Sequence, residues 1–428
     1  MTLQTKPTDG DTEWFVDDRF GLFIHWGIYA LPARHEWVKS YEKMADGQYD
    51  RYFRHFDPDL YDPNAWAEAA ANAGMKYFIV TTKHHDGFCL WDSALTDYKA
   101  INTAYGKDIL GPMVDAFRSK GLRSCLYHSL LDWHHPYFPI TDFHPQDSHG
   151  KRAELNVGRD AAIYADYLHA QTRELLTKFG KIDMLWYDFS YDDMGREQWQ
   201  SEKLLKMIRN LQPNIILNDR LDLDHGWDIK TREQIQVREW VRVNGQPVVW
   251  EACQTFSGSW GYHRDEETWK STDMLIKMLI DTVSKGGNLV LNVGPTGRGE
   301  FDERVLDRLK GIGEWMKRHN RSIYGCTQAP EEFQTREDCR YTYNPKTNRL
   351  YAHIFSWPFR HLHLDGLAGR VEYAQLLNDA SEVKMHDGLH SGLYGADVAE
   401  KNKNTLTLEL PIKPPANAAV PVIELFLK

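Results

Sequence analysis

Cysteine is scarce in this sequence and follows no recognisable spacing. The five cysteines among 428 residues are Cys89, Cys125, Cys253, Cys326 and Cys339, an odd number without a CxxC pair. This pattern argues against a disulfide framework or a cysteine zinc site, and it predicts reduced thiols in a reducing compartment. The N-terminal stretch MTLQTKPTDGDTEWF also lacks the apolar core of a secretory signal. We therefore expect a cytoplasmic protein.

Long apolar runs and a surplus of positive charge are missing as well. No run reaches the roughly 18 residues that a membrane-spanning helix requires. The 61 Asp and Glu residues outnumber the 51 Lys and Arg residues, so the formal net charge is −10 at pH 7. We therefore predict no nucleic-acid and no membrane partner. The sequence leaves open whether the chain forms a homo-oligomer.

Tryptophan and tyrosine are, by contrast, numerous, with 15 and 21 residues. Sugar rings have apolar C–H faces and polar rims, so carbohydrate sites use indole and phenol surfaces beside hydrogen-bonding groups. A large core would require the same residues, so the count alone does not separate a sugar site from ordinary packing.

Short apolar runs alternate with amphipathic stretches through the first three quarters of the chain. Seven runs are predicted as strands: residues 21–26, 77–82, 124–129, 184–188, 215–218, 248–252 and 288–293. Helices are predicted between several of them: residues 63–72, 110–120, 161–178 and 202–211. Nearly continuous apolar strands separated by helices indicate a parallel sheet covered on both faces. We predict an α/β fold with a (β/α)8-like barrel, irregular between residues 218 and 248, where the helical pattern fails.

The last part of the chain has a different pattern. Six short strands are predicted there: residues 341–343, 350–355, 361–364, 371–377, 405–410 and 420–427. Short strands at this spacing are typical of an antiparallel sandwich. We predict two domains, a barrel over residues 1–323 and a C-terminal β-sandwich over residues 324–428.

Polar side chains follow five of the predicted barrel strands. These positions are His25, residues 83–86, residues 132–135, Asp188, and Asp219 with Arg220. Active sites of such barrels form at the C-terminal ends of the strands, where the loops converge. We therefore expect these side chains to meet in one pocket.

Each of these residues also has a purely structural explanation. His25 alone is compatible with a hydrogen-bonded core histidine. His84 and His85 point to opposite faces if they lie on a strand, so a structural role for one of them stays open. The His and Asp pairs also suggest a metal site, but no HExxH or similar spacing supports one, and we predict no metal. The carboxylate of Asp188 ends a buried run and is therefore either catalytic or paired, with Arg220 as its ionic partner.

Eight segments in the first 320 residues carry a more specific signal. They are RFGLFIHWGIYALPARHEWV (19–38), KYFIVTTKHHDGFCLWDS (76–93), LYHSLLDWHHP (126–136), IDMLWYDFS (182–190), LNDR (217–220), WDIKTREQ (227–234), WEACQTFSGSWGYHRDE (250–266) and GGNLVLNVGPTGRGE (286–300). In this order they resemble glycoside hydrolase family 29, the α-L-fucosidases. The resemblance implies that family's barrel followed by its β-sandwich.

The resemblance also implies two catalytic carboxylates. The family nucleophile is the aspartate that closes a Trp-x-Asp strand end, which here is Asp188 after Trp186. A glycine usually follows it in the family, whereas Phe189 stands here. The best match to the acid/base is Glu233 in DIKTREQ. Glu251 in WEACQTF competes for that role, and we prefer to assign it to structural support of the pocket.

A fucose-binding set is implied in the same way. Its members are His25, Glu36, Trp37, His84, His85, Tyr127, Trp186, Arg220 and Trp260. The methyl group of this 6-deoxy sugar suits an aromatic surface such as Trp186 or Trp260, and its hydroxyls suit imidazoles, Glu36 and Arg220. His128 stands where a tyrosine is commoner in the family, and it either alters the pocket rim or packs.

The implied activity is that of a retaining exo-α-L-fucosidase, which hydrolyses a small-molecule fucosylated glycan through a covalent fucosyl-enzyme without metal or cofactor. Three alternatives stay open. They are a metal-dependent hydrolase on the same barrel, a catalytically silent carbohydrate-binding protein, and a glycosidase acting on another deoxy or galacto-configured sugar. Retention of both carboxylates argues against the silent protein. The sequence predicts neither the linkage nor the aglycone.

Overall fold

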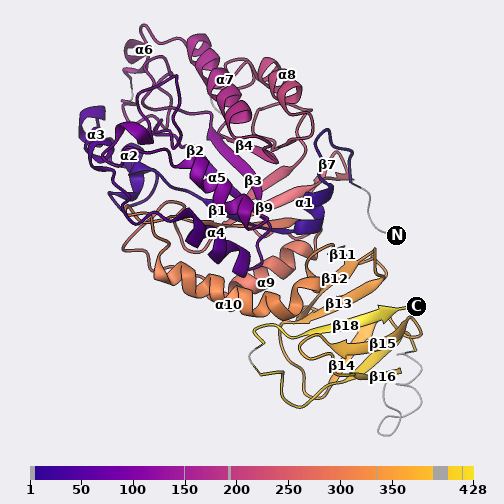
Figure 1. The fold of residues 1–428 in the computed structure, drawn as a ribbon. Coiled ribbons are helices and arrows are strands. Elements are labelled where there is room, and N and C mark those ends of the chain that lie inside the picture. The colour runs from indigo at the N-terminus through magenta and orange to yellow at the C-terminus, as the bar shows by residue number, and fades with distance from the viewer. Residues whose placement is uncertain (1–4, 149, 191–193, 334, 389–402, 417) are drawn as a thin grey trace.

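The computed structural model describes residues 5–148, 150–190, 194–333, 335–388, 403–416 and 418–428. A larger α/β part comes first along the chain, and a smaller all-β part follows it (Figure 1). The last helix of the larger part, α10 (Glu303–His319), leads into the smaller part. The order of helices and strands therefore follows the predicted two-part pattern.

Eight parallel strands form the sheet of the larger part. They are β1 (Phe20–Ile24), β2 (Tyr77–Lys83), β3 (Arg123–Ser129), β4 (Met184–Asp188), β5 (Ile216–Leu217), β6 (Lys230–Glu233), β9 (Trp250–Thr255) and β10 (Asn288–Val293). They pair in the order β5-β4-β3-β2-β1-β10-β9-β6. The end strands β5 and β6 meet at a parallel bridge between Asn218 and Ile229, beside which Ile229 N–H donates to the carbonyl of Leu217. The sheet thus closes into the predicted barrel, and β5–β6 is its shortest join.

Helices follow six of the eight strands and cover the outside of the barrel (Figure 1). They are α4 (Pro63–Asn72) after β1, α5 (Leu110–Ser119) after β2, α7 (Ala161–Lys178) after β3, α8 (Ser201–Leu211) after β4, α9 (Thr272–Val283) after β9, and α10 after β10. The remaining helices are α1 (Glu13–Asp18), α2 (Val38–Tyr41), α3 (Asp46–His55), α6 (Arg152–Leu155), η1 (Ile28–Ala30), η2 (Ala100–Asn102) and η3 (Asn320–Ser322). Among the described residues no helix follows β5 or β6. The hairpin of β7 (Arg242–Val243) and β8 (Gln246–Pro247) lies there instead, in the region predicted to be irregular.

Side-chain caps mark where the long barrel helices begin. Asp62 accepts hydrogen bonds from two backbone N–H groups of α4, whose first residue is Pro63. Asp160, Ser271 and Asp302 cap α7, α9 and α10 in the same way. Such caps stabilise a helix by about 1 kcal/mol each, because they satisfy N–H groups that have no partner within the helix. They also fix how far each loop extends from the strand before it.

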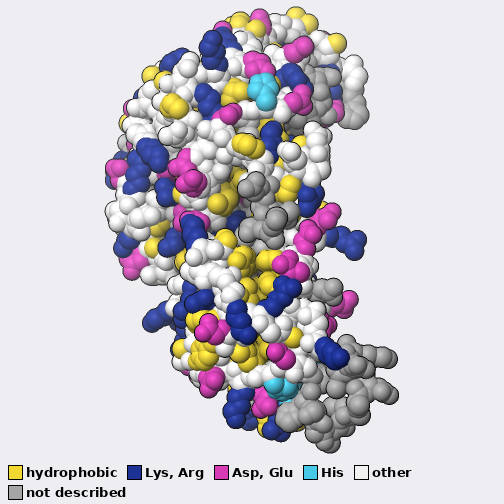
Figure 2. Space-filling model, turned by 90° about the vertical axis from the view of Figure 1, so that its right-hand side faces the viewer, with side chains coloured by type: hydrophobic (Ala, Val, Ile, Leu, Met, Phe, Trp, Pro, Cys, Tyr) yellow, Lys and Arg dark blue, Asp and Glu magenta, His cyan; other side chains and the backbone are white. Residues whose placement is uncertain are grey.

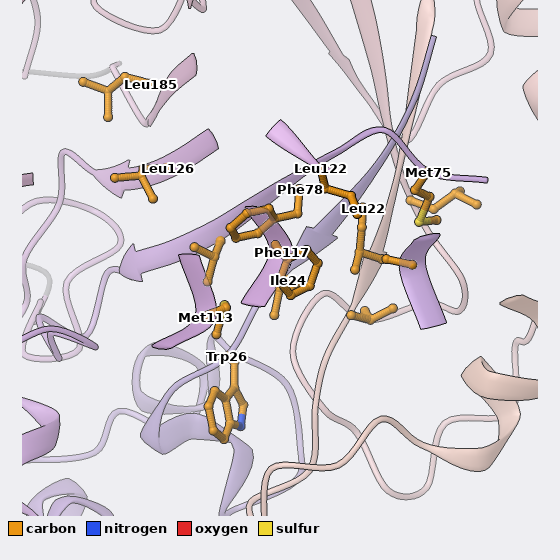
Figure 3. Packing of buried hydrophobic residues seen from close by; sticks show 14 of the residues in the cluster. Leu22, Ile24, Trp26, Met75, Phe78, Met113, Phe117, Leu122, Leu126 and Leu185 are labelled. Atoms are coloured by element: carbon orange, nitrogen blue, oxygen red, sulfur yellow. The ribbon is translucent and has the colours of Figure 1, made fainter. Parts of the chain in front are cut away.

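Two buried layers lie on opposite sides of the barrel sheet. Alternate residues of each strand point outward, so Leu22 and Ile24 of β1 and Phe78 of β2 pack against the helices (Figure 3). Phe78 and Phe117 of α5 are in ring contact, with centroids 4.1 Å apart. Figure 3 shows these side chains together between the strands and α5. This outer layer holds the helices on the sheet.

The inner layer contains the other half of each strand. Phe23 of β1, Ile79 of β2 and Met184 and Trp186 of β4 belong to one cluster inside the barrel. The two-residue period places Asp188 on the same side as Trp186, at the end of the strand. A carboxylate at the barrel mouth is therefore a direct consequence of the order of residues in β4.

The smaller part consists of two antiparallel sheets packed on each other. Its strands are β11 (Thr327–Gln328), β12 (Cys339–Asn344), β13 (Arg349–Ile354), β14 (His361–Asp365), β15 (Val371–Leu376), β16 (Lys384–Asp387), β17 (Thr405–Glu409) and β18 (Val422–Leu427). The sheet orders are β11-β12-β13-β18-β15 and β14-β17-β16. Leu350 and Ile423 of one sheet and Leu364 and Leu408 of the other share one core. The predicted sandwich is confirmed, with β11 and β16 as strands that were not predicted.

The two parts share buried contacts. Trp315 of α10 donates its indole N–H to the carbonyl of Val420 (2.8 Å), and Tyr351 and Val422 belong to the hydrophobic cluster that surrounds the barrel. Figure 2 shows hydrophobic side chains gathered where the larger and smaller parts meet. A division between residues 323 and 324 stays a prediction.

The five cysteines act as small core residues. All of them lie in the described part of the chain, where each is buried and none forms a disulfide. None of the described helices has the length and apolar character needed to cross a membrane.

Candidate active site

A cavity of 540 Å³ lies at the C-terminal ends of the barrel strands. The predicted site residues all line it: His25, Glu36, Trp37, His84, His85, Tyr127, Trp186, Asp188, Arg220, Glu233 and Trp260. A larger cavity of 1020 Å³ lies between α9 and the first strands of the smaller part, and it contains none of them. The residues singled out by their chemistry therefore converge on the smaller of these two cavities.

Asp188 is held by two donors. The Tyr127 hydroxyl donates to its Oδ2 (2.9 Å) and Arg220 Nη1 donates to its Oδ1 (3.0 Å). Burial raises the pKa of Asp188 to about 6, although the charge of Arg220 and the Tyr127 hydrogen bond oppose the rise, while the charge of Glu233 adds to it. The carboxylate is therefore mostly ionised at pH 7.

Arg220 joins Asp188 to Glu233. Its Nη2 donates to Glu233 Oε2 (3.2 Å) while Nη1 contacts Asp188. Thr231 accepts from Arg220 Nε (3.1 Å), and the guanidinium lies 5.2 Å from the Trp186 ring centroid. The Glu233 side chain is 42% exposed, against 12% for Asp188. One planar cation thus faces two carboxylates, one enclosed by protein and one open to solvent.

The chain turns sharply after each of these carboxylates. Phe189 follows Asp188 with φ of 71°, and Gln234 follows Glu233 with φ of 52°. Residues other than glycine rarely adopt this left-handed backbone conformation. Phe189 therefore keeps a backbone shape that the family's glycine would favour. The Gln234 side chain is anchored by donation to Thr255 Oγ1 (2.8 Å).

His25 is neutral and its proton position is fixed by its neighbours. Burial lowers its pKa to about 3. Asn292 donates to the carbonyl of Trp260 (2.6 Å), so its amide oxygen faces His25 Nδ1 (2.5 Å) and accepts the proton there. His25 Nε2 is consequently the unprotonated nitrogen and acts as a hydrogen-bond acceptor.

Both His84 and His85 line the cavity. The prediction that adjacent histidines point to opposite faces does not apply, because β2 ends at Lys83, after a register irregularity between Thr81 and Lys83. Both members of the pair therefore reach the cavity, as their place in the implied fucose-binding set requires.

The tautomer of His85 follows from Ser129. The single hydroxyl proton of Ser129 goes to the carbonyl of Leu131 (2.9 Å), so His85 Nδ1 is the donor in its 2.6 Å contact with Ser129 Oγ. Burial holds the pKa of His85 well below its usual value, so the ring is neutral. Its bare Nε2 lies 3.7 Å from Asp188 Oδ2. Two acceptors therefore lie side by side, and a ligand hydroxyl can donate its single proton to one of them.

Three buried polar atoms of cavity-lining residues have no hydrogen-bond partner among the described residues: His84 Nδ1, His85 Nε2 and Glu36 Oε1. Burial raises the pKa of Glu36 to about 7, and its other oxygen accepts from Gly261 N–H (2.7 Å). Buried polar atoms in native proteins are nearly always satisfied, so these atoms point to a ligand rich in hydroxyl groups.

Glu251 lies beneath the cavity and does not line it. It is fully buried, and its two oxygens accept from Trp186 Nε1 (3.2 Å) and Tyr77 OH (3.1 Å). Burial raises its pKa to about 7. Both of its oxygens are thus engaged in orienting the aromatic floor, as expected of a supporting residue.

Other polar residues at the strand ends do not reach the cavity. Lys83 and Asp132 form a buried ion pair (3.1 Å), and Asp86 accepts from Tyr49 OH (2.8 Å). His128 packs outside the barrel, with Nδ1 3.0 Å from Thr82 Oγ1. Asp219 accepts from Thr231 and pairs with Lys230 (3.0 Å), also away from the cavity. The expectation that all of the strand-end polar groups meet in one pocket is therefore wrong for residues 83, 86, 132–135 and 219. These groups hold the loops in place instead.

Sequence analysis missed several residues of the cavity: Phe23, His35, Tyr41, Phe143, Phe189, Gln234, Cys253 and Gly258. Phe23 and Cys253 lie on strands and follow the inward two-residue period, which gives a signal that could have found them. Phe143 lies in a loop without periodicity. Among the described residues no group of three or more His, Cys, Asp or Glu side chains is arranged to hold a metal ion.

Comparison with known proteins gives one consistent result. The family model for α-L-fucosidase matches residues 2–321. The solved α-L-fucosidase isoenzyme 1 of Paenibacillus thiaminolyticus is 43% identical, with a TM-score of 0.91 over 97% of this chain and 98% of that one. The plasma α-L-fucosidase of Rattus norvegicus is 30% identical, covering 81% of this chain and 77% of its own length.

A second solved structure bears on the chemistry. It is a family 29 α-L-fucosidase of Bacteroides thetaiotaomicron, 27% identical with a TM-score of 0.84 over 100% of this chain and 98% of that one. It is described as a trapped covalent intermediate with 2-fluoro-fucosyl fluoride in a glutamate-to-glutamine variant. By the match along its first three quarters and by its whole fold, this chain belongs to the α-L-fucosidase family of glycoside hydrolases.

Proposed function

We propose that the protein is a retaining exo-α-L-fucosidase that removes terminal α-L-fucosyl residues from small fucosylated glycans. One observation carries this proposal: a single guanidinium, that of Arg220, contacts the carboxylates of both Asp188 and Glu233 inside the cavity. Double displacement in retaining glycosidases uses two carboxyl groups that face one cavity, and these two residues supply such a pair. The solved relative trapped as a covalent intermediate supports the same route.

In the proposed mechanism Asp188 attacks the anomeric carbon and Glu233 protonates the departing oxygen. A covalent fucosyl-enzyme forms on Asp188. Glu233 then takes a proton from water as the water attacks the same carbon, and fucose leaves with its configuration retained. The 42% exposure of the Glu233 side chain suits this second step, because water reaches it directly.

The ligand hydroxyls have acceptors ready for them. His25 Nε2 and His85 Nε2 are unprotonated for the reasons given above. Glu36 Oε1 lies 3.3 Å from His35 Nδ1 but accepts no hydrogen bond from the described residues. A sugar hydroxyl donates to such an acceptor and, in turn, accepts from Arg220 or another donor. Trp186 and Trp260 offer apolar faces to the 6-methyl group. This combination suits a deoxy sugar better than a fully hydroxylated one.

The stereochemistry tests the proposal. Proton NMR of early hydrolysis of an α-L-fucoside is expected to show α-L-fucose as the first-formed anomer. Release of β-L-fucose would exclude the double displacement. Failure to hydrolyse any α-L-fucoside while binding fucose would favour the silent carbohydrate-binding protein.

Azide rescue assigns the two acids separately. Asp188→Ala is expected to lower kcat by roughly 10³ or more, because no nucleophile remains. With an activated fucoside, azide then enters from the face opposite the leaving group and gives β-L-fucosyl azide. Azide with Glu233→Ala attacks the fucosyl-enzyme and gives the α-azide. If Glu251→Ala rather than Glu233→Ala yields the α-azide, the acid/base assignment is wrong.

A further inference from the structure

The cavity has an enclosed floor and an open mouth. His84, His85, Tyr127 and Trp186 on the floor are at most 3% exposed. Tyr41, which also lines the cavity, is 67% exposed and therefore lies at its mouth. A fucosyl ring bound beside Asp188 occupies the floor, so whatever is joined to its anomeric oxygen extends toward the mouth.

One side of this mouth is built from four aromatic residues, here called the aromatic wall: Trp37, Tyr41, Phe143 and Phe189. Trp37 is central. Its ring centroid lies 5.4 Å from that of Phe189, 5.7 Å from that of Phe143 and 5.8 Å from that of Tyr41, with which it stacks. The wall is therefore continuous from the residue after Asp188 out to solvent.

Phe189 has a conformation that argues for a role of its ring. Its φ of 71° lies in the left-handed region, which is strained for a residue with a side chain and readily adopted by glycine. Glycine would make the same turn without strain. The ring of Phe189 meets His85 edge-on at 4.8 Å and also contacts Phe143 at 5.9 Å. Strain retained at a binding cavity is a reason to look for a contact made by the strained residue.

Polar groups complete the mouth of the cavity. Arg220, Glu233 and Gln234 line it without belonging to the aromatic wall, and Glu233 is the group proposed to protonate the departing oxygen. A leaving group must therefore reach Glu233 while one of its faces remains available to the wall. A pyranose ring fits such a site, because it has an apolar C–H face for aromatic contact and hydroxyls at its edge for polar groups.

We propose that the aromatic wall is an acceptor subsite that binds the sugar ring to which fucose is attached. The substrates are accordingly fucosides whose aglycone begins with a pyranose, in preference to fucose on a small alcohol. This inference rests on the proposed fucosidase activity and adds to it the residues that recognise the sugar ring of the leaving group. Phe189 is the specificity-determining residue, because its ring extends the wall up to the nucleophile.

The test compares two fucosides in the full-length protein. One is 2′-fucosyllactose, which presents a pyranose to the wall, and the other is methyl α-L-fucoside, which presents no ring. The measured quantity is the kcat/KM value for 2′-fucosyllactose divided by the kcat/KM value for methyl α-L-fucoside. Phe189→Gly is the main variant, because glycine adopts the φ of 71° without strain and folding is preserved. Phe143→Ala is the second variant.

We expect Phe189→Gly to lower the ratio by about tenfold and Phe143→Ala to lower it by a smaller factor, since one aromatic contact contributes this order of selectivity. Phe359→Ala, which truncates an aromatic residue 80% exposed on the smaller part, serves as the matched control and leaves the ratio unchanged. The inhibition constant of free L-fucose should change less than the ratio.

Two results would overturn the subsite. If Phe189→Gly lowered kcat/KM by the same factor for both fucosides and raised the inhibition constant of L-fucose to match, Phe189 would be a support of the cavity floor and not part of an acceptor subsite. A ratio unchanged in both wall variants would remove the wall from acceptor binding. If the unaltered protein hydrolyses neither fucoside, the failure lies with the proposed function itself and not with the subsite.

Discussion

Arg220 sets the charge state of the residue it contacts. Burial raises the pKa of Asp188 to about 6, and the guanidinium is the largest influence that opposes this rise. The proposed nucleophile must be ionised to react, so we expect turnover to depend on how far the charge of Arg220 counteracts the effect of burial on the pKa of Asp188. In the unaltered protein kcat/KM is therefore expected to fall as the pH drops below about 6.

Arg220→Met tests this dependence. Without the cation the pKa of Asp188 rises further, so the acidic limb of the kcat/KM profile should move to higher pH. At neutral pH we expect a loss of roughly ten- to a hundredfold, as for removal of a hydrogen bond to a charged group. The measurement is the dependence of kcat/KM on pH from the acidic limb to neutral pH. Arg196→Met, which removes an outlying arginine paired with Asp222 and Asp224, provides the control. An acidic limb that stays in place would show that Arg220 does not tune the nucleophile.

Single residues differ in how far their roles could be predicted. Asp188 could be predicted as a site residue because it ends a buried run of residues. Glu233 and the histidines of the cavity could be predicted only from the sequence motifs that contain them. The choice between Glu233 and Glu251 depends on which acid reaches the cavity, and short strands of similar composition do not reveal that. The position of Phe143 depends on a loop path, for which no sequence period exists.

At the level of strands, the two-residue period decides which side chains reach the site. This period could be predicted for the long apolar strands, whose bounds agree with the structure within a few residues. The strand β6 could not be predicted from its pattern, because Lys230–Glu233 contains three charged residues in four and only Thr231 is buried. A strand that carries the proposed acid/base at an open mouth has little reason to be apolar, so hydropathy does not mark it.

Glu251 shows how one strand supports another. Glu251→Ala leaves Trp186 Nε1 and the Tyr77 hydroxyl of neighbouring strands without an acceptor in a buried layer. We expect a loss of about 2–5 kcal/mol in the free energy of unfolding, measured by urea denaturation. Glu251→Gln keeps one acceptor and should lose less. Equal stability of the two variants would contradict this explanation.

The loop after β3 depends on a buried ion pair. Asp132 accepts from Lys83 Nζ (3.1 Å), and both side chains are at most 2% exposed. Asp132→Ala leaves an uncompensated ammonium inside the protein, so we expect a destabilisation of about 3–5 kcal/mol. Asp166→Ala, which breaks a pair with Lys203 on the surface, should change stability by no more than about 0.5 kcal/mol. Thermal and urea unfolding of the two variants would show the difference, and a similar effect of both would contradict it.

Across the whole molecule, the two parts are joined by packed surfaces in addition to the chain itself. Trp315 is 4% exposed, donates to Val420, and lies in the cluster that also contains Tyr351. Arg340 of β12 pairs with Asp281 of α9 (2.9 Å). The sequence pattern predicted two folds but not this shared cluster, since contacts between distant segments leave no periodic signal.

A shared cluster should make unfolding cooperative. We expect calorimetry to show one thermal transition, with fluorescence and circular dichroism giving the same midpoint. Trp315→Ala removes the central contact and should lower the midpoint and broaden or split the transition. Two separate transitions in the unaltered protein would show that the parts unfold independently.

The brief pairing of β5 with β6 makes the barrel uneven in its resistance to deformation. β4, which carries Asp188, pairs with β3 along five residues and with β5 along two. β6, which carries Glu233, pairs with β9 along four residues and meets β5 at one bridge. We therefore expect the side of the mouth next to β5 and β6 to yield first to a bulky leaving group, which would move the proposed acid/base before the proposed nucleophile.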